Sequence, residues 1–263
     1  MTTASPVGVT FPRVVRSEWI KFRSLRSSWV TMLMAVVAVV GIGLLVTYET
    51  STHVQEVLRR EGSINAVERS LPGVFLAQLA IGVLGILFVS GEYGTGMIRA
   101  TLAAVPRRLP VVAAKLLVFC SLTFVVMTAA VFVAFWGGQG FLGRYGVSVH
   151  APHVLRALIG AGLYLTVVAL FGIGLGFALR STAGGISTLF GLFFVLPIIV
   201  RFLPLSWENT LRPYLPTEAG TKVFGVGVPQ PGDLGPWTGL GVFALWAAAA
   251  VTAGVVLLRR RDA

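Results

Sequence analysis

The sequence predicts an all-α integral membrane protein with six transmembrane helices. Of its 263 residues, 56% are hydrophobic and 12% are charged, whereas soluble globular chains carry roughly 25% charged residues. The mean hydropathy is +0.85. A soluble protein of this length could not hide so much apolar surface, because a sizeable fraction of its residues must face water. The 31 glycines suit helices that pack closely in a bilayer.

A helix needs roughly 20 residues to cross the hydrocarbon layer, and six apolar runs in the sequence approach this length. They lie near Trp29–Tyr48, Leu71–Ser90, Leu116–Trp136, Ala157–Leu179, Gly184–Val200 and Trp237–Leu258. The fifth run is the shortest and contains Pro197, so we expect a kink or an early end there. The runs contain no Asp, Glu, Lys, Arg or His, and we therefore expect no proton relay inside the membrane. We interpret residues 1–263 as one transmembrane domain.

The distribution of cations predicts that both termini are cytoplasmic. With the amino terminus inside, the inner segments hold 13 of the 21 Lys and Arg residues but only three of the ten acids. Such an inner excess of cations orients membrane proteins, and an even number of spans agrees with it. We expect a multi-pass protein of the cell membrane. Its cations lie at the ends of apolar runs, which argues against a nucleic-acid-binding face.

The residues before the first run predict a basic helix at the membrane interface. Residues 1–28 would form a cytoplasmic tail and this helix. At helical spacing Val15, Trp19 and Phe22 share an apolar face, Lys21 and Arg23 point away from it, and Arg26 reaches up to the headgroups. The helix would serve either as a simple anchor or as an element that transmits motion.

The segment 91–110 joins the second and third runs and predicts a short cytoplasmic helix. Its residues Ile98, Leu102 and Val105 repeat at i, i+4 and i+7 and would form one apolar stripe. Before them, Gly94 and Gly96 allow a sharp turn. After them, Pro106 would stop the helix, with Arg107 and Arg108 near its carboxyl end. The stripe would either enter a groove of a soluble partner or rest on lipid headgroups.

The order of these parts resembles the membrane subunits of type-2 ABC transporters, in the form common among actinobacteria. These export permeases pair with a separate ATP-binding subunit. The stretch from Gly91-Glu92-Tyr93-Gly94-Thr95-Gly96 to Pro106-Arg107-Arg108 looks like their coupling-helix region. The resemblance implies a homodimer, or a heterodimer with a second permease, and one ATPase docked beneath each coupling helix. The docking residues would be Glu92, Tyr93, Gly94, Thr95, Gly96, Met97, Ile98, Arg99, Leu102, Val105, Arg107 and Arg108.

The chain itself is not expected to be an enzyme or to hold a cofactor or metal. A phosphate-binding loop needs Ser or Thr after its lysine, and Lys21, Lys115 and Lys222 precede Phe, Leu and Val. ATP and Mg²⁺ would bind to the partner ATPase. His150 and His153 flank a proline with no carboxylate close by, a poor pattern for a metal site.

The segment 204–236 is too polar and too rich in Pro and Gly to span the membrane. The resemblance implies short extracytoplasmic helices there that re-enter the outer leaflet before the last span. Trp207, Leu211, Tyr214 and Leu215 would supply their apolar and interfacial side chains, as an extracytoplasmic gate or as a structural lid.

The expected function is that of an ABC exporter permease that moves a hydrophobic or amphipathic substrate outward. Relatives are associated with drugs, natural products, lipids and peptides. Two alternatives remain. One is a membrane scaffold or immunity protein without transport, and the other is a polytopic membrane enzyme. Only a test for a partner ATPase would separate the scaffold from the permease.

Overall fold

The computed structural model describes residues 10–105, 107–227 and 232–260, and every regular element in these ranges is a helix. Six helical segments are long and apolar enough to cross a membrane: Arg26–Thr52, Gly73–Gly94, Arg108–Tyr145, Val154–Leu179, Thr182–Arg201 and Pro236–Arg260. This confirms the all-α class and six long apolar helices at the positions of the predicted spans. Several of the helices run past the ends of the apolar runs, which brings charged residues into them.

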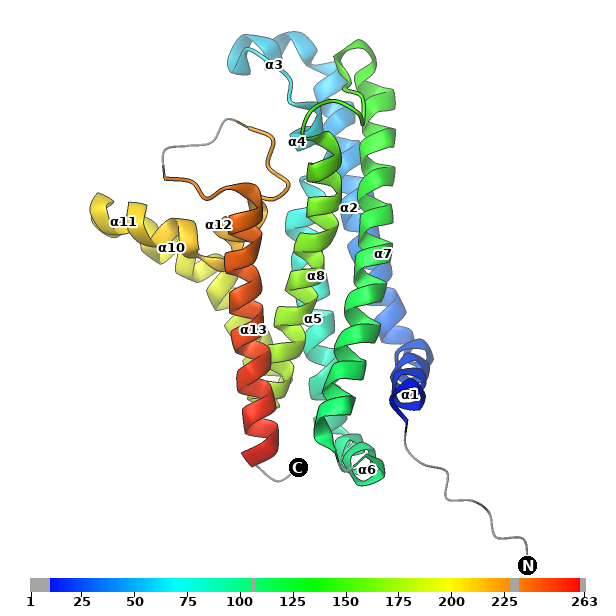
Figure 1. Ribbon diagram of the computed structural model, residues 1–263. Helices are drawn as coiled ribbons and strands as arrows, with labels where there is room; N and C mark the ends of the chain where they lie inside the picture. Colours follow the sequence, from blue (N-terminus) through cyan, green and yellow to red (C-terminus); the bar gives the residue numbers. More distant parts are fainter. Residues whose placement is uncertain (1–9, 106, 228–231, 261–263) are drawn as a thin grey trace, which may run out of the picture.

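Five of these helices form an elongated bundle (Figure 1). They are α2 (Arg26–Thr52), α5 (Gly73–Gly94), α7 (Arg108–Leu142), α8 (Val154–Leu179) and α13 (Pro236–Arg260). At one end, which we call the basal end, lie α1 (Phe11–Ser24), α6 (Met97–Ala104) and the last turn of α13. At the opposite, distal end lie α3 (Val54–Glu61), α4 (Ala66–Ser70) and the turn η1 (Gly143–Tyr145).

Glycines set the close spacing of α8 against its neighbours. A Cβ atom on Gly172 would collide with the carbonyl of Gly82 on α5. A Cβ atom on Gly174 would lie 2.6 Å from the backbone nitrogen of Val251 on α13. Because side chains are absent at these points, the helix backbones can approach closely, as they do at small-residue contacts in membranes.

The fifth span is interrupted by a π-helical turn. It consists of α9 (Thr182–Phe190), the π-helix η2 (Gly191–Val195) and α10 (Leu196–Arg201). The predicted irregularity is present, but it precedes Pro197, which lies in the first turn of α10. Pro197 has no N–H for the Phe193 carbonyl four residues back, and that carbonyl accepts a hydrogen bond from the Thr217 hydroxyl at 3.5 Å.

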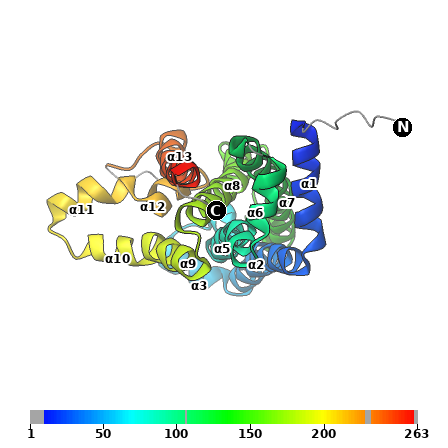
Figure 2. The same cartoon turned by 90° about the horizontal axis from the view of Figure 1, so that it is seen from below.

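After the π turn, the chain leaves the bundle sideways and returns to it. Both views show α10 and α11 (Leu205–Leu211) projecting away from the other helices (Figures 1 and 2). The turn η3 (Arg212–Tyr214) and α12 (Pro216–Thr221) lead back to α13. The short helices expected between residues 204 and 236 are therefore present. Residues 228–231 of that segment lie outside the described ranges.

Candidate functional site

Helix α1 lies beside α7 near the basal end, crosswise to the bundle (Figures 1 and 2), and buries one face. Its buried residues are Val14, Glu18 and Phe22, spaced i, i+4 and i+8. The Phe22 ring meets the rings of Phe88 and Phe119 at centroid distances of 5.7 and 6.0 Å. The predicted apolar face is thus divided, since Trp19 stays 38% exposed while Phe22 is fully buried.

Four charged side chains meet where α1 contacts α5 and α7. We call them the basal ion cluster: Glu18, Lys21, Glu92 and Lys115. The Lys115 ammonium lies 2.7 Å from a Glu18 oxygen and 2.8 Å from a Glu92 oxygen. The Lys21 ammonium contacts the same two carboxylates at 2.7 and 3.0 Å. Two carboxylates and two ammonium groups alternate, so the basal ion cluster carries no net charge. It joins α1, α5 and α7.

The basal ion cluster is shielded from solvent. The side chains of Glu18 and Lys115 are fully buried, and that of Glu92 is 9% exposed. The Lys115 ammonium also lies 4.3 Å from the centroid of the Phe88 ring, at a distance typical of a cation–π contact. Buried charges are costly unless they are paired and hydrogen-bonded. The cluster therefore makes the position of α1 depend on α5 and α7.

Lys21 extends this network to α6, because its ammonium donates to the Thr101 hydroxyl at 3.0 Å. Burial lowers the pKa of Lys21, but hydrogen bonds and the negative charges of Glu18 and Glu92 outweigh it, and the net pKa is raised. Lys21 therefore remains an ammonium at neutral pH. Lys21 was expected to point away from the apolar face of this helix, but its ammonium turns toward the carboxylates of Glu18 and Glu92.

The basal ion cluster was not predicted from the sequence, because each of its members has the position of an ordinary interfacial charge. Lys115 immediately precedes an apolar run and Glu92 closely follows another. In the structure, α7 begins at Arg108 and α5 ends at Gly94, so both residues lie inside spanning helices. One available signal was Glu18, a lone acid whose helical neighbours at i−4 and i+4 are Val14 and Phe22.

The short helix predicted between the second and third runs is present as α6. Its apolar stripe faces the rest of the chain. The helix starts after Gly96, whose φ of 71° is a left-handed conformation that favours glycine. Ile98 is 2% exposed, and Leu102 and Val105 are half-buried against other parts of the chain. The face left exposed bears Met97, Arg99, Ala100, Ala103 and Ala104. Pro106, expected to stop the helix, lies outside the described ranges.

The remaining residues predicted to dock a partner differ in accessibility. Gly94, Thr95, Gly96 and Arg107 are exposed, Glu92 is buried, and Tyr93 is half-buried with the Arg180 guanidinium 5.1 Å from its ring centroid. Arg108 donates from Nη1 to the carbonyl of Leu258, near the end of α13. Arg180 likewise donates to the carbonyl of Leu257 at 3.1 Å. Cations are favoured at the carboxyl end of a helix. Arg108 was expected at the carboxyl end of α6, but it binds the carboxyl end of α13.

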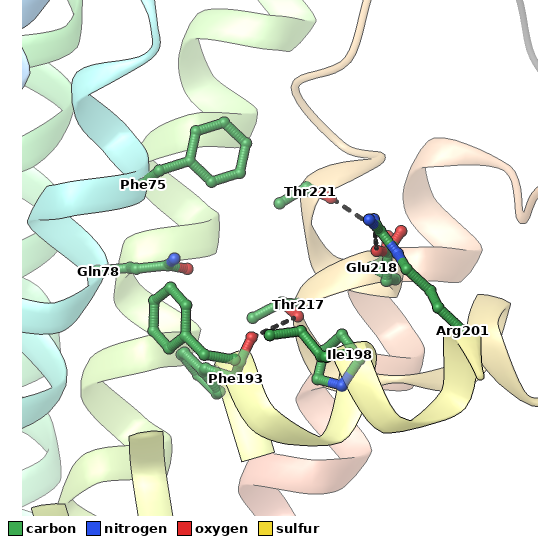
Figure 3. A pocket seen from close by; sticks show the side chains of 10 residues that line it. Phe75, Gln78, Phe193, Ile198, Arg201, Thr217, Glu218 and Thr221 are labelled. Carbon is green, nitrogen blue, oxygen red and sulfur yellow. Dashed lines mark hydrogen bonds and ion pairs between the residues drawn. The ribbon is translucent and has the colours of Figure 1, made fainter. Parts of the chain in front are cut away.

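A cavity of about 360 Å³ opens between α5, the fifth span and α12, and we call it the distal cavity (Figure 3). Its lining comprises Phe75, Gln78, Phe193, Phe194, Pro197, Ile198, Arg201, Thr217, Glu218 and Thr221. The Glu218 carboxylate pairs with Arg201 at 3.7 Å and with Arg212 at 3.5 Å. The cavity therefore combines apolar walls with an ion pair.

The four predicted gate residues do not line the distal cavity. Trp207, Leu211 and Tyr214 are 63%, 42% and 55% exposed, while Leu215 is buried. The backbone carbonyl of Tyr214 accepts a hydrogen bond from the Trp246 indole at 3.0 Å, which ties this segment to α13.

Comparison with known proteins does not assign the chain to a family: no family model matches it, and no curated protein matches it significantly. Among the residues that the structure describes, no three His, Cys, Asp or Glu side chains gather as a metal-binding group.

Proposed function

We propose that this chain is the membrane-spanning permease subunit of an ATP-binding-cassette exporter, located in the cell membrane with both termini in the cytoplasm. The observation that carries the proposal is α6, a short helix between the second and third spans that binds the bundle through one face and leaves the other exposed. A separate ATPase subunit, which would bind ATP and Mg²⁺, docks on the exposed face. The permease works as a homodimer or as a heterodimer with a second permease.

The basal ion cluster would carry motion from α6 into the spans. Thr101 of α6 binds Lys21 of α1, and Lys21 binds Glu18 and Glu92. Both carboxylates also bind Lys115 on α7. Because these buried charges lose stabilisation when they separate, a force on α6 would move α1, α5 and α7 together. The driving force then comes from the ATPase.

The lining of the distal cavity suits a substrate with an apolar body and a polar group. Phe75, Phe193 and Ile198 would contact the apolar part, while Arg201 and Glu218 lie on the polar side (Figure 3). Ligand sites commonly combine apolar walls with a few polar groups in this way. The segment from α11 to α12 would serve as the extracytoplasmic gate, with its short helices re-entering the outer leaflet.

The docking proposal is tested by co-purification with the ATPase encoded beside this chain. Ala100→Glu places a carboxylate on the exposed face of α6, and its desolvation in an interface should weaken ATPase capture about tenfold or more. The matched control is Ser27→Glu, which adds the same charge at an exposed basal position outside α6. Capture and hydrolysis should be normal in the control.

The alternative of a non-transporting scaffold predicts a different outcome. A scaffold would show no substrate-stimulated ATP hydrolysis with the neighbouring ATPase, in the wild type or in either variant. Equal ATPase capture by Ala100→Glu and Ser27→Glu would reject docking on α6.

A further inference from the structure

A second cavity, of about 500 Å³, lies at the basal end between the start of α7 and the end of α13. Its described lining residues are Arg107, Arg108, Leu109, Pro110 and Arg259, and we call it the basal arginine cavity. Its volume falls within the range of roughly 300–1,000 Å³ that small-ligand sites occupy. No residue of the basal ion cluster or of the exposed face of α6 is among its described lining residues, although Arg107 and Arg108 also belong to the residues expected to dock an ATPase.

The basal arginine cavity concentrates positive charge. Three guanidinium groups line it, and no carboxylate is among its described lining residues. Glu18 and Glu92, the acids of the basal end within the described ranges, are bound to lysines. The amino end of α7 lies here, with Arg107 as an N-cap that makes no side-chain capping bond, and its positive dipole end adds to the field. The negative carboxyl end of α13 lies here too, and Arg108 binds its Leu258 carbonyl. The cavity is suited to an anion.

The arginine geometry favours a phosphate oxyanion. Arg108 is anchored to the Leu258 carbonyl, which holds this side chain between α7 and α13. Arg107 and Arg259 are exposed, one on each helix. Planar guanidinium groups bind phosphate oxygens in pairs, which an ammonium group does less well.

The position of the cavity selects a lipid as the source of the phosphate. It lies at the same end of two candidate membrane spans, where headgroups are found. Beside the arginines, the wall is apolar, with Leu109 46% exposed and Pro110 next to it. Basic pockets between spans are known to bind acidic headgroups. We propose that the basal arginine cavity binds the phosphate of an acidic membrane phospholipid, whose glycerol and first acyl carbons contact Leu109.

This proposal requires the six spans but not the transport function, so the test uses the full-length chain without any ATPase. The protein in a non-ionic detergent is titrated with phosphatidylglycerol, phosphatidylcholine or inorganic phosphate at constant ionic strength. Native mass spectrometry then counts the bound lipids. We expect one phosphatidylglycerol per chain to bind preferentially, and inorganic phosphate not to displace it.

Paired variants locate the bound lipid. Arg107→Gln with Arg259→Gln should weaken phosphatidylglycerol binding about tenfold or more, given the contribution of each arginine near an anionic headgroup. The matched control, Arg16→Gln with Arg23→Gln, removes two exposed basal arginines on α1 and should change binding little. Arg108 is left intact because it caps α13. A third pair, Arg107→Lys with Arg259→Lys, keeps the charge and should show intermediate weakening.

Three outcomes would overturn the proposal. Equal binding of the acidic and the zwitterionic lipid would show that no anion site exists. Equal weakening in the cavity and α1 pairs would indicate diffuse attraction to the basal surface. Displacement of the lipid by inorganic phosphate would make the site one for a soluble anion.

Discussion

At the scale of single residues, Lys115 has the most demanding environment in the described chain. Its side chain is fully buried in a spanning helix, where an isolated ammonium group would be strongly disfavoured. Two carboxylates from different helices lie within 2.8 Å of its Nζ atom. The charge is therefore stable only while α1 and α5 remain in place.

Replacing Lys115 by Met should destabilise the protein by about 3–5 kcal/mol, because Glu18 and Glu92 would then share one lysine in a buried site. The measurement is the unfolding midpoint in detergent. Arg60→Met is the control: Arg60 also pairs with a glutamate, but its side chain is 75% exposed, and such pairs contribute about 1 kcal/mol or less.

A second variant distinguishes lost charge balance from lost packing. Lys115→Met combined with Glu18→Gln leaves one lysine and one carboxylate, so it should be more stable than Lys115→Met alone. If Lys115→Met unfolds like the Arg60 control, the basal ion cluster does not hold the basal end together.

Apart from the i, i+3 pair of Glu18 and Lys21, these interactions could not be predicted from the sequence, because no local spacing connects them. Glu18 and Lys115 are 97 residues apart, and Lys21 and Glu92 are 71 apart. Hydropathy places each residue near the end of a run but gives no information about which ends meet. The individual charges were thus visible, while their pairing depends on how the helices pack.

At the scale of helices, the sequence predicted which helices exist and which of their residues share a face better than it predicted what each face contacts. The Ile98, Leu102 and Val105 stripe was correct as a stripe, but periodicity alone does not say whether a stripe meets a partner or its own chain. The expectation that Arg108 would interact with the carboxyl end of the short helix in segment 91–110 was wrong, because its guanidinium binds the carboxyl end of α13. The distal cavity depends on the π turn, for which Pro197 was the only indication in the sequence.

The spacing of α8 against α13 should depend on Gly174. In Gly174→Ala the new Cβ would lie 2.6 Å from Val251 N and 2.8 Å from the Ala250 carbonyl carbon, both backbone atoms. The helices must separate, at a cost of about 1–3 kcal/mol. Gly41→Ala on α2 is the control, since nothing lies within 4 Å of its new Cβ, and helix propensity should make it neutral or stabilising.

Unfolding in detergent measures both glycine variants. Equal midpoints for Gly174→Ala and Gly41→Ala would mean that α8 and α13 are not held at the spacing described above.

At the scale of the whole molecule, the number of candidate spans is even, so α2 begins and α13 ends at the same, basal end (Figure 1). Most cations of the chain belong to that basal end, including those of α1, α6 and the last turn of α13. The excess of Lys and Arg predicts that the basal end faces the cytoplasm.

Thiol labelling in intact cells checks this orientation. In a Cys120→Ala background, Gln55→Cys on α3 should react with a membrane-impermeant maleimide. Ala103→Cys on α6 should react only after the cells are permeabilised. Both positions are exposed in the structure, so accessibility within the protein does not bias the comparison. The opposite labelling pattern would put α6 beyond the reach of a cytoplasmic ATPase.

The basal ion cluster also constrains the order in which a newly made chain matures. Glu18 is translated 97 residues before Lys115, so α1 is made well before the helix that carries this lysine. Until α7 follows, the Glu18 carboxylate has only Lys21 of its own helix as a counterion, and we expect α1 to stay at the water boundary. We expect α1 to pack against the bundle only after α7 has entered the membrane, so that these helices assemble in a fixed order.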